Sequence, residues 1–111
     1  MCIRDSYKMS LPETAIGMEL PPLLVALADS RISRRHMTRV ALQSEVYTPD
    51  NAVDAGFIDE VVDAGELDAR SMAIAERLAS LPEAQYAANK LSIRAQTLNV
   101  MQDSIDQLFK R

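Results

Sequence analysis

Apolar residues recur at helical spacing through the second half of the chain and predict two amphipathic helices there. In the segment 64–80 they recur mostly three, four or seven residues apart, at Leu67, Ile74, Ala75 and Leu78. In the segment 83–109 the apolar stripe is longer: Ala84, Ala87, Ala88, Leu91, Ala95, Leu98, Met101, Ile105 and Leu108. A helix of that length measures on the order of 40 Å. Because a small domain is narrower than this, we expect part of the last helix to lie against something other than this chain's own core.

The first half of the chain predicts shorter elements. A helix is expected to begin at the prolines of residues 20–22, since proline is favoured in a first helical turn, and to end near residues 29–31. Ser33 is a suitable N-cap for a second helix. The apolar stripe of that second helix is Met37, Val40 and Ala41.

The stretch "YTPDNAVDAGFIDEVVD", residues 47–63, is the best delimited part of the sequence. Thr48 suits an N-cap and Pro49 a first helical turn. Gly56 follows after barely two turns and suits a helix end, because glycine readily takes the left-handed conformation found there. The β-branched run that follows, residues 57–62, predicts a short strand.

A second short strand is predicted at residues 7–11, with residues 15–18 also extended. Two short strands do not make an independently stable sheet. Either they pair with strands from outside this chain, or the chain is mostly helical with two extended pieces. The spacings Asp63–Glu66 and Ser80–Glu83 predict capping boxes in front of the last two helices.

Charge and composition exclude several classes of protein. The 111 residues carry a formal net charge of −4, whereas nucleic-acid binders show a basic face, so we expect no nucleic-acid partner. No apolar run approaches the roughly 20 residues that span a bilayer, so we expect no membrane partner. The one cysteine, Cys2, excludes an internal disulfide and agrees with a cytoplasmic location. One histidine and no clustered carboxylates predict no metal site.

The first six residues, "MCIRDS", lead into no periodic pattern and have no apolar centre of the kind a signal peptide needs. They resemble translated adaptor sequence from assembled reads. We therefore expect native sequence to begin near Tyr7, and we leave residues 1–6 out of functional reasoning.

Glu13 is the candidate catalytic residue, within "SLPETAIGMELPP", residues 10–22. Apolar neighbours, Ile16, Met18 and Leu20, would partly desolvate its carboxylate, and desolvation favours the proton-carrying form. A carboxyl group balanced between its two forms can give and take a proton. Considered alone, Glu13 fits a solvated residue at a strand end, or a helix-capping acid, at least as well.

A second motif changes this balance. "PETAIG", followed by helices and then by Ala52, Ala55, Gly56, Phe57, Val61 and Val62, resembles the C-terminal half of the crotonase superfamily, the enoyl-CoA hydratases and isomerases. That family shows Pro-Glu-x-x-x-Gly, then A-x-x-A-G before a strand, then two amphipathic helices. The likeness covers essentially all of residues 7–111.

The resemblance implies a fold, a set of parts and a site. The fold would be α/β: the C-terminal part of a crotonase-like ββα spiral, mostly helical here with two short strands. Residues 7–63 would end the spiral core, and residues 64–111 would form the C-terminal helical trimerisation region. Glu13 would exchange a proton at Cα of an enoyl thioester. The implied substrate-binding residues are Pro12, Ile16, Gly17, Leu20 and Pro21.

The family's second glutamate and its oxyanion N–H groups lie upstream of the matching positions, so Glu13 fits hydration and double-bond isomerisation alike. The resemblance implies an acyl-CoA substrate, no separate cofactor and a homotrimer or hexamer. The turn reads "GMELPP", where many members are glycine-rich, which leaves acyl-chain preference open. A different class also stays open: a non-catalytic helical module for oligomerisation. His36, among arginines, is expected at the surface, and the Arg31–Arg35 run in a solvated helix start or subunit salt bridges.

Overall fold

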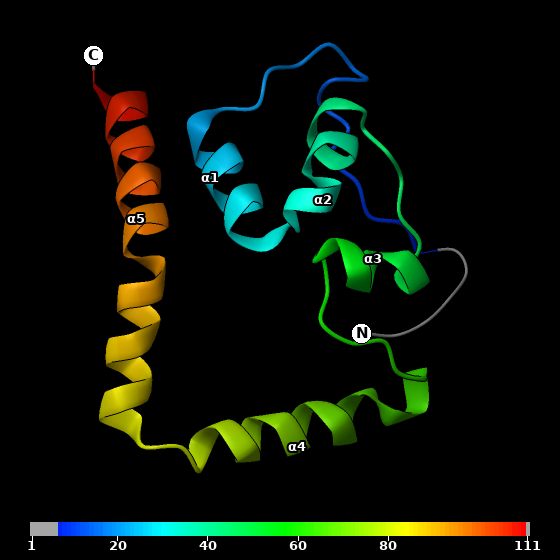
Figure 1. Cartoon of the computed structure of the whole chain (residues 1–111), viewed down its shortest axis with the longest axis vertical. Coiled ribbons are helices and arrows are strands. Elements are labelled where there is room, and N and C mark those ends of the chain that lie inside the picture. The colour runs from blue at the N-terminus through cyan, green and yellow to red at the C-terminus, as the bar shows by residue number, and fades with distance from the viewer. Residues whose placement is uncertain (1–6, 111) are drawn as a thin grey trace.

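The computed structural model describes residues 7–110, and these residues are mostly helical. Figure 1 shows the short helices of the first half of the chain gathered together and the longer helices of the second half extending from them. The helical segments in chain order are α1 (Pro22–Arg31), α2 (Arg34–Met37), the π-helical turn η1 (Thr38–Leu42), α3 (Pro49–Ala55), the 3₁₀ turn η2 (Ala64–Glu66), α4 (Leu67–Ala79) and α5 (Glu83–Phe109). The predicted adaptor scar at residues 1–6 lies outside the described residues.

The molecule is open in shape. α4 runs away from the short helices and α5 turns back beside α1 (Figure 1). The radius of gyration is 16.7 Å, whereas a compact domain of this length has about 13 Å. One long-range hydrogen bond fixes α5, from the Leu23 N–H at the start of α1 to Oγ of Ser104, over 3.1 Å. Every residue of α4 from Asp68 to Ala79 is exposed.

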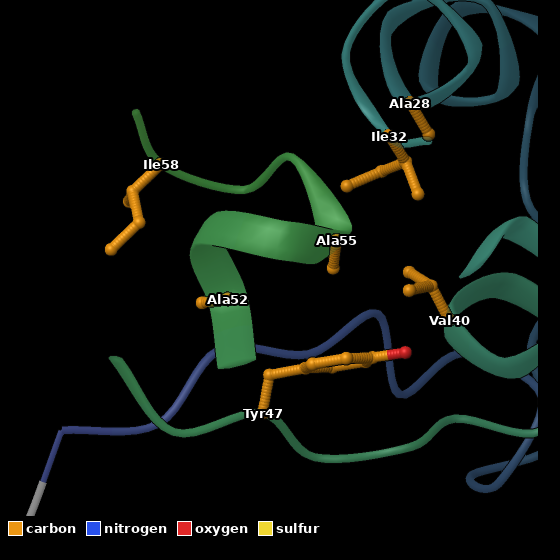
Figure 2. Close-up of a cluster of buried hydrophobic side chains, with 7 residues drawn as sticks. All are labelled: Ala28, Ile32, Val40, Tyr47, Ala52, Ala55 and Ile58. Carbon is orange, nitrogen blue, oxygen red and sulfur yellow. The ribbon is translucent and has the colours of Figure 1, made fainter. Parts of the chain in front are cut away.

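The buried core lies among α1, α2, η1 and α3. Figure 2 shows the ring of Tyr47 lying below α3, with its hydroxyl directed toward Val40. Val40, with Ala41 and half-buried Met37, confirms the predicted stripe of the second helix. The seven core residues are Ala28, Ile32, Val40, Tyr47, Ala52, Ala55 and Ile58.

The short helix α3 begins and ends where the sequence predicts. The Thr48 N–H donates to Oδ1 of Asn51 over 2.8 Å and so closes the helix start. Gly56 ends the helix with φ of 97°, a left-handed conformation that suits glycine. A Cβ at this position would also overlap the carbonyl oxygen of Arg31 and lie 3.3 Å from the Ser33 nitrogen. The glycine therefore lets α3 pack directly on the end of α1.

The two predicted strands are absent from the described residues 7–110. Residues 7–11 make only one isolated antiparallel bridge, between Met9 and Tyr47, with N–H···O distances of 2.9 and 2.8 Å. A single bridge leaves the remaining backbone groups without a ladder. In residues 57–62 only Val62 takes part in a bridge, and Phe57 and Val61 pack against the core. Within the described chain no neighbouring strand is available, so neither run forms a sheet.

The predicted capping boxes in front of the two long helices are wrong, although the bounds of α4 and α5 agree with the predicted ranges. Asp63 precedes η2 without a side-chain cap hydrogen bond. Ser80 ends α4 instead of starting α5, and its hydroxyl donates to the carbonyl of Arg77 over 2.6 Å. The spacing correctly places Ser80 at a helix boundary. It does not show which helix the hydroxyl bonds to, because a serine hydroxyl can satisfy an orphan carbonyl at a helix end as readily as an orphan N–H at a helix start.

Candidate functional site

Glu13 lies in a tight turn, not at the end of a strand. The Met18 N–H donates to the Glu13 carbonyl over 2.8 Å, and the Gly17 N–H donates to the Thr14 carbonyl over 3.2 Å. These two bonds form the closing pattern found at helix ends, completed by Gly17 at φ of 75°. The predicted extended course of residues 15–18 is therefore wrong. The turn explains the four-residue spacing from Glu13 to Gly17, since the closure needs glycine at that place.

Two hydrogen bonds fix this turn to a distant segment. Oγ1 of Thr14 donates to the Ala41 carbonyl over 3.0 Å, and the Ala15 N–H donates to Oγ of Ser44 over 3.1 Å. Ala41 belongs to η1, where the last carbonyls of a helical segment lack partners within it. The turn that carries Glu13 is thus attached to the end of η1.

The Glu13 side chain is half-buried, and its Oε2 is fully buried without a hydrogen-bond partner among the described residues. A buried polar oxygen without a partner is uncommon and calls for an explanation. Glu19, the other acid of this stretch, is exposed, and it precedes the first turn of α1. The structure thus distinguishes the two carboxylates by burial.

The predicted substrate-binding residues surround Glu13 in the chain but differ in exposure. Pro12, Gly17 and Pro21 are exposed, Ile16 is 63% exposed, and Leu20 is half-buried. Pro21 is the N-cap residue of α1. Pro12, Ile16 and Gly17 thus adjoin or belong to the turn of residues 13–17, whereas Leu20 and Pro21 lead into α1.

Two cavities flank the contact between α1 and α5. The larger, of about 710 Å³, is lined by Leu11, Phe57 and apolar side chains of both helices, with Arg31 and Arg94 among its polar residues. The smaller, of about 560 Å³, includes Leu20 and Arg34 in its lining. Glu13 lines neither cavity, although Leu11 and Leu20 belong to the same stretch of chain. Within residues 7–110 no three His, Cys, Asp or Glu side chains gather as metal ligands would.

His36 is buried, with 6% exposure, so its predicted surface position is wrong. Its Nε2 lies 2.7 Å from Oδ2 of Asp54, and its Nδ1 lies 3.0 Å from the Tyr47 hydroxyl. Both ring nitrogens of His36 are therefore within hydrogen-bond distance of a polar partner, one in Asp54 and the other in Tyr47. The ring thereby joins α2 to α3 and to the segment before α3. No sequence spacing indicates this trio, since its members lie 11 and 18 residues apart.

The charges around this trio have clear causes. The hydrogen bond from His36, and next the Arg35 charge, hold the pKa of Asp54 below its ordinary value of 3.8. Burial, and next the negative charge of Glu45, raise the pKa of the Tyr47 hydroxyl above 10.0. Arg35 lies 2.8 Å from Oδ1 of Asp54.

The arginine run is engaged in ion pairs within the chain. Arg35 pairs with Asp54, and Arg31 lies 2.7 Å from Oδ1 of Asp59. Arg35 of α2 thus reaches Asp54 of α3, before Gly56. Arg31 at the end of α1 reaches Asp59, after Gly56. Both pairs reinforce the close contact that this glycine allows.

Comparison with solved structures identifies the architecture. An enoyl-CoA hydratase from Mycobacterium marinum superposes with a TM-score of 0.84 at 27% sequence identity, over 92% of this chain and 45% of that chain. An enoyl-CoA isomerase from Mycobacterium tuberculosis gives 0.85 at 28% identity, over 92% and 45%. The chain is structurally related to the enoyl-CoA hydratase/isomerase (crotonase) family. An enoyl-CoA hydratase/isomerase family protein from Pseudomonas syringae gives 0.85 at 29% identity, over 91% and 44%.

The crotonase relationship concerns part of the fold. The chain spans about 45% of the length of the structures it matches. A scan of protein-family models and a search of curated proteins each found no match. The structural likeness agrees with the resemblance carried by "PETAIG" and by the Ala52–Gly56 motif.

No helix within residues 7–110 is long and apolar enough to cross a membrane.

Proposed function

We propose that this chain belongs to an enoyl-CoA hydratase/isomerase-type enzyme that adds water reversibly to a 2-enoyl-CoA. The observation that carries the proposal is the half-buried Glu13 carboxylate with a buried, unpartnered Oε2. Its turn lies within a chain whose structure matches enoyl-CoA hydratases and isomerases. The unpartnered oxygen keeps an unused acceptor site, which a carboxylate in a closed hydrogen-bond network lacks. Because this oxygen is buried and Glu13 lines neither cavity, a substrate reaches it only if the covering side chains move.

Glu13 would act as the group that carries the proton at Cα. In hydration, the carboxylic acid form would give its proton to Cα while the oxygen of water adds at Cβ. The proton lost by that water would go to the second glutamate that the resemblance implies, and the reverse reaction would return the Cα proton to the Glu13 carboxylate. Proton transfer by a positioned side chain typically contributes ~10²–10⁴-fold. The oxyanion donors and second glutamate implied by the resemblance are not matched in this sequence. We therefore expect the 111 residues alone to show no turnover.

Isomerisation is the nearest alternative. The carboxylate would then remove a proton from one carbon of the acyl chain and return it to another, which also needs Glu13. The solved structures favour neither reaction, since a hydratase and an isomerase match equally well. Other acyl-CoA chemistry on the same fold also remains open, because fold does not fix reaction.

A second candidate function is a helical oligomerisation module without catalysis. The observation that favours it is the exposed apolar surface of α4 and α5, which includes Leu91, Ile93 at 82% exposure and Phe109 at 83%. Large exposed apolar faces mark interaction sites. Assembly into a homotrimer or hexamer belongs to either proposal.

The test is an assay of the protein expressed from the complete reading frame that encodes this chain. Loss of the conjugated double bond of a short 2-enoyl-CoA would be followed by absorbance, and a 3-enoyl-CoA would be supplied in parallel. Hydration predicts consumption of the first substrate. Conversion of the second substrate alone would favour the isomerase, and no change in either would contradict both.

A further inference from the structure

The turn around Glu13 is held from outside by side chains that no catalytic role requires. Thr14 and Ala15 bond to Ala41 and Ser44, which lie 27 and 29 residues further along the chain. Each bond uses one hydroxyl group, at Thr14 and at Ser44. The two bonds reach adjacent residues of the turn, so they limit both its translation and its rotation.

The orientation of the Glu13 carboxylate depends on this backbone. Its Oε2 has no hydrogen-bond partner in the described part of the chain. No hydrogen bond fixes that oxygen, so the position of the carboxylate depends on the packing around it and on where the turn places the Glu13 Cα. Displacement of a catalytic group by about 1 Å can cost roughly 10²-fold in rate.

Ser44 adopts an unfavourable backbone conformation to make its bond. Its φ is 52°, the one left-handed non-glycine residue among residues 7–110. The loop is wound onto the end of η1 by Gln43 N–H to Thr38 carbonyl (3.1 Å) and Glu45 N–H to Arg39 carbonyl (3.0 Å). Glycine would take this conformation at lower cost, but it has no hydroxyl for the Ala15 N–H.

We propose that Thr14 and Ser44 are positioning residues that hold the Glu13 carboxylate in place for proton transfer. The proposal rests on the proposed function for its catalytic consequence. Whether the two hydroxyl groups set the position of Glu13 can be measured without any assay of catalysis.

The substitutions separate positioning from stability. Thr14→Val removes one hydroxyl at nearly constant shape, and Thr14→Ser keeps it. Ser44→Gly removes the other hydroxyl but relieves the left-handed strain, and because the relief offsets the lost hydrogen bond, the free energy of unfolding should change little. Ser30→Ala is the matched control, because the Ser30 hydroxyl donates only to the Leu27 carbonyl of its own helix, over 2.7 Å.

Two measurements follow, on the 111-residue chain and on the protein from the complete reading frame. In the chain, the NMR signal of the Glu13 carboxyl carbon should shift in Thr14→Val and Ser44→Gly. The Ala15 amide should exchange roughly two- to tenfold faster in Ser44→Gly, as expected for one lost hydrogen bond. In the enzyme, kcat should fall by ~10-fold or more in both variants with KM within about twofold, while Thr14→Ser retains activity.

The outcomes distinguish the two proposals. A wild-type enzyme without turnover contradicts the proposed function, and the Glu13 carboxyl signal then decides the positioning proposal. The positioning proposal is overturned if the Glu13 carboxyl signal has the same position in Thr14→Val, Ser44→Gly and the control Ser30→Ala. It is also overturned if an active enzyme keeps its kcat in both variants, or if Thr14→Ser loses as much as Thr14→Val.

Discussion

At the scale of single residues, glycine is required at two positions, Gly17 and Gly56, for different physical reasons. Gly17 has φ of 75° but open space where a Cβ would lie, whereas Gly56 has φ of 97° and the Arg31 carbonyl in that space. Gly17 therefore needs only a left-handed conformation. Gly56 needs that conformation and also the absence of a side chain.

Alanine substitutions should rank accordingly. Gly17→Ala should lower the free energy of unfolding by ~1–2 kcal/mol, the usual cost of a left-handed L-residue. Gly56→Ala should cost roughly 3 kcal/mol, because the Arg31 backbone must also move. Gly65→Ala is the control, since no atom lies within 4 Å of the place that a Cβ would take there and the backbone of Gly65 is not left-handed. Urea unfolding of the three variants measures the order, and equal losses at Gly17 and Gly56 would contradict this account of Gly56.

His36 supplies a second residue-scale prediction. Removing its ring leaves the buried Tyr47 hydroxyl without its partner, which typically costs about 1–3 kcal/mol beyond lost packing. His36→Phe should therefore destabilise the chain, and Tyr47→Phe in the same background should recover part of the loss. A double-mutant cycle by urea unfolding checks this coupling. Strictly additive effects would show that the 3.0 Å contact contributes nothing.

At the scale of elements, the sequence predicts local features better than their partners. The bounds of α3 and α5 follow from Pro49, Gly56 and the long apolar stripe, since each signal acts within the element itself. The strands at residues 7–11 and 57–62 do not form, because a strand depends on a neighbour that sequence propensity does not supply. The turn around Glu13 differs from the strands: its closing hydrogen bonds are local and Gly17 marks them, whereas its attachment to the end of η1 depends on distant residues that no spacing indicates.

α3 is joined to α2 by charge, which predicts a dependence on pH. The pKa of Asp54 is lower in the folded chain than its ordinary value of 3.8, chiefly through the His36 hydrogen bond. Because the pKa of Asp54 is lower in the folded chain than in the unfolded chain, its carboxylate contributes fully to the free energy of unfolding at pH values above 3.8. That contribution is lost as the pH falls through the lowered pKa of the folded chain. Wild type should therefore lose more stability on acidification through this range than Asp54→Asn.

Thermal or urea unfolding at a series of acidic pH values measures this difference. Glu60, whose pKa is lowered by Arg70, provides the comparison. Glu60→Gln should remove its own acid-dependent contribution and leave that of Asp54 in place. Parallel stability curves for wild type and Asp54→Asn would contradict the assigned role of the pair.

At the scale of the whole molecule, the open shape and the exposed apolar side chains have one cause, because α4 and much of α5 extend away from the core and leave their apolar side chains uncovered. From the length of the last helix, the sequence predicts that part of this helix lies against something other than the chain's own core. The exposure of Leu91 and Ile93 and the radius of gyration of 16.7 Å agree with a helix that is only partly packed on this chain. What covers α4 and α5 is not encoded in their periodicity, because an apolar stripe has the same spacing whether it meets its own core or another chain.

The exposed surface predicts self-association of the chain in solution. Sedimentation should show mass rising with concentration, and the double substitution Leu91→Glu with Ile93→Glu should shift the chain toward monomer. Both side chains are well exposed, at 63% and 82%, so the folded chain can accept the charges. Asn99→Glu adds a charge at an exposed polar position of α5 and should change little. A chain that is monomeric at all concentrations would remove the case for an oligomerisation module.

The central claim of the proposed function is that Glu13 carries the proton. The deciding measurement compares Glu13→Gln with Glu19→Gln in the enzyme expressed from the complete reading frame, with a short 2-enoyl-CoA as substrate. Both changes remove one carboxylate from the same stretch, but only Glu13 carries a buried oxygen without a partner among the described residues. The account predicts that Glu13→Gln lowers kcat by ~10²-fold or more while Glu19→Gln stays near wild type. Full turnover in Glu13→Gln would contradict it.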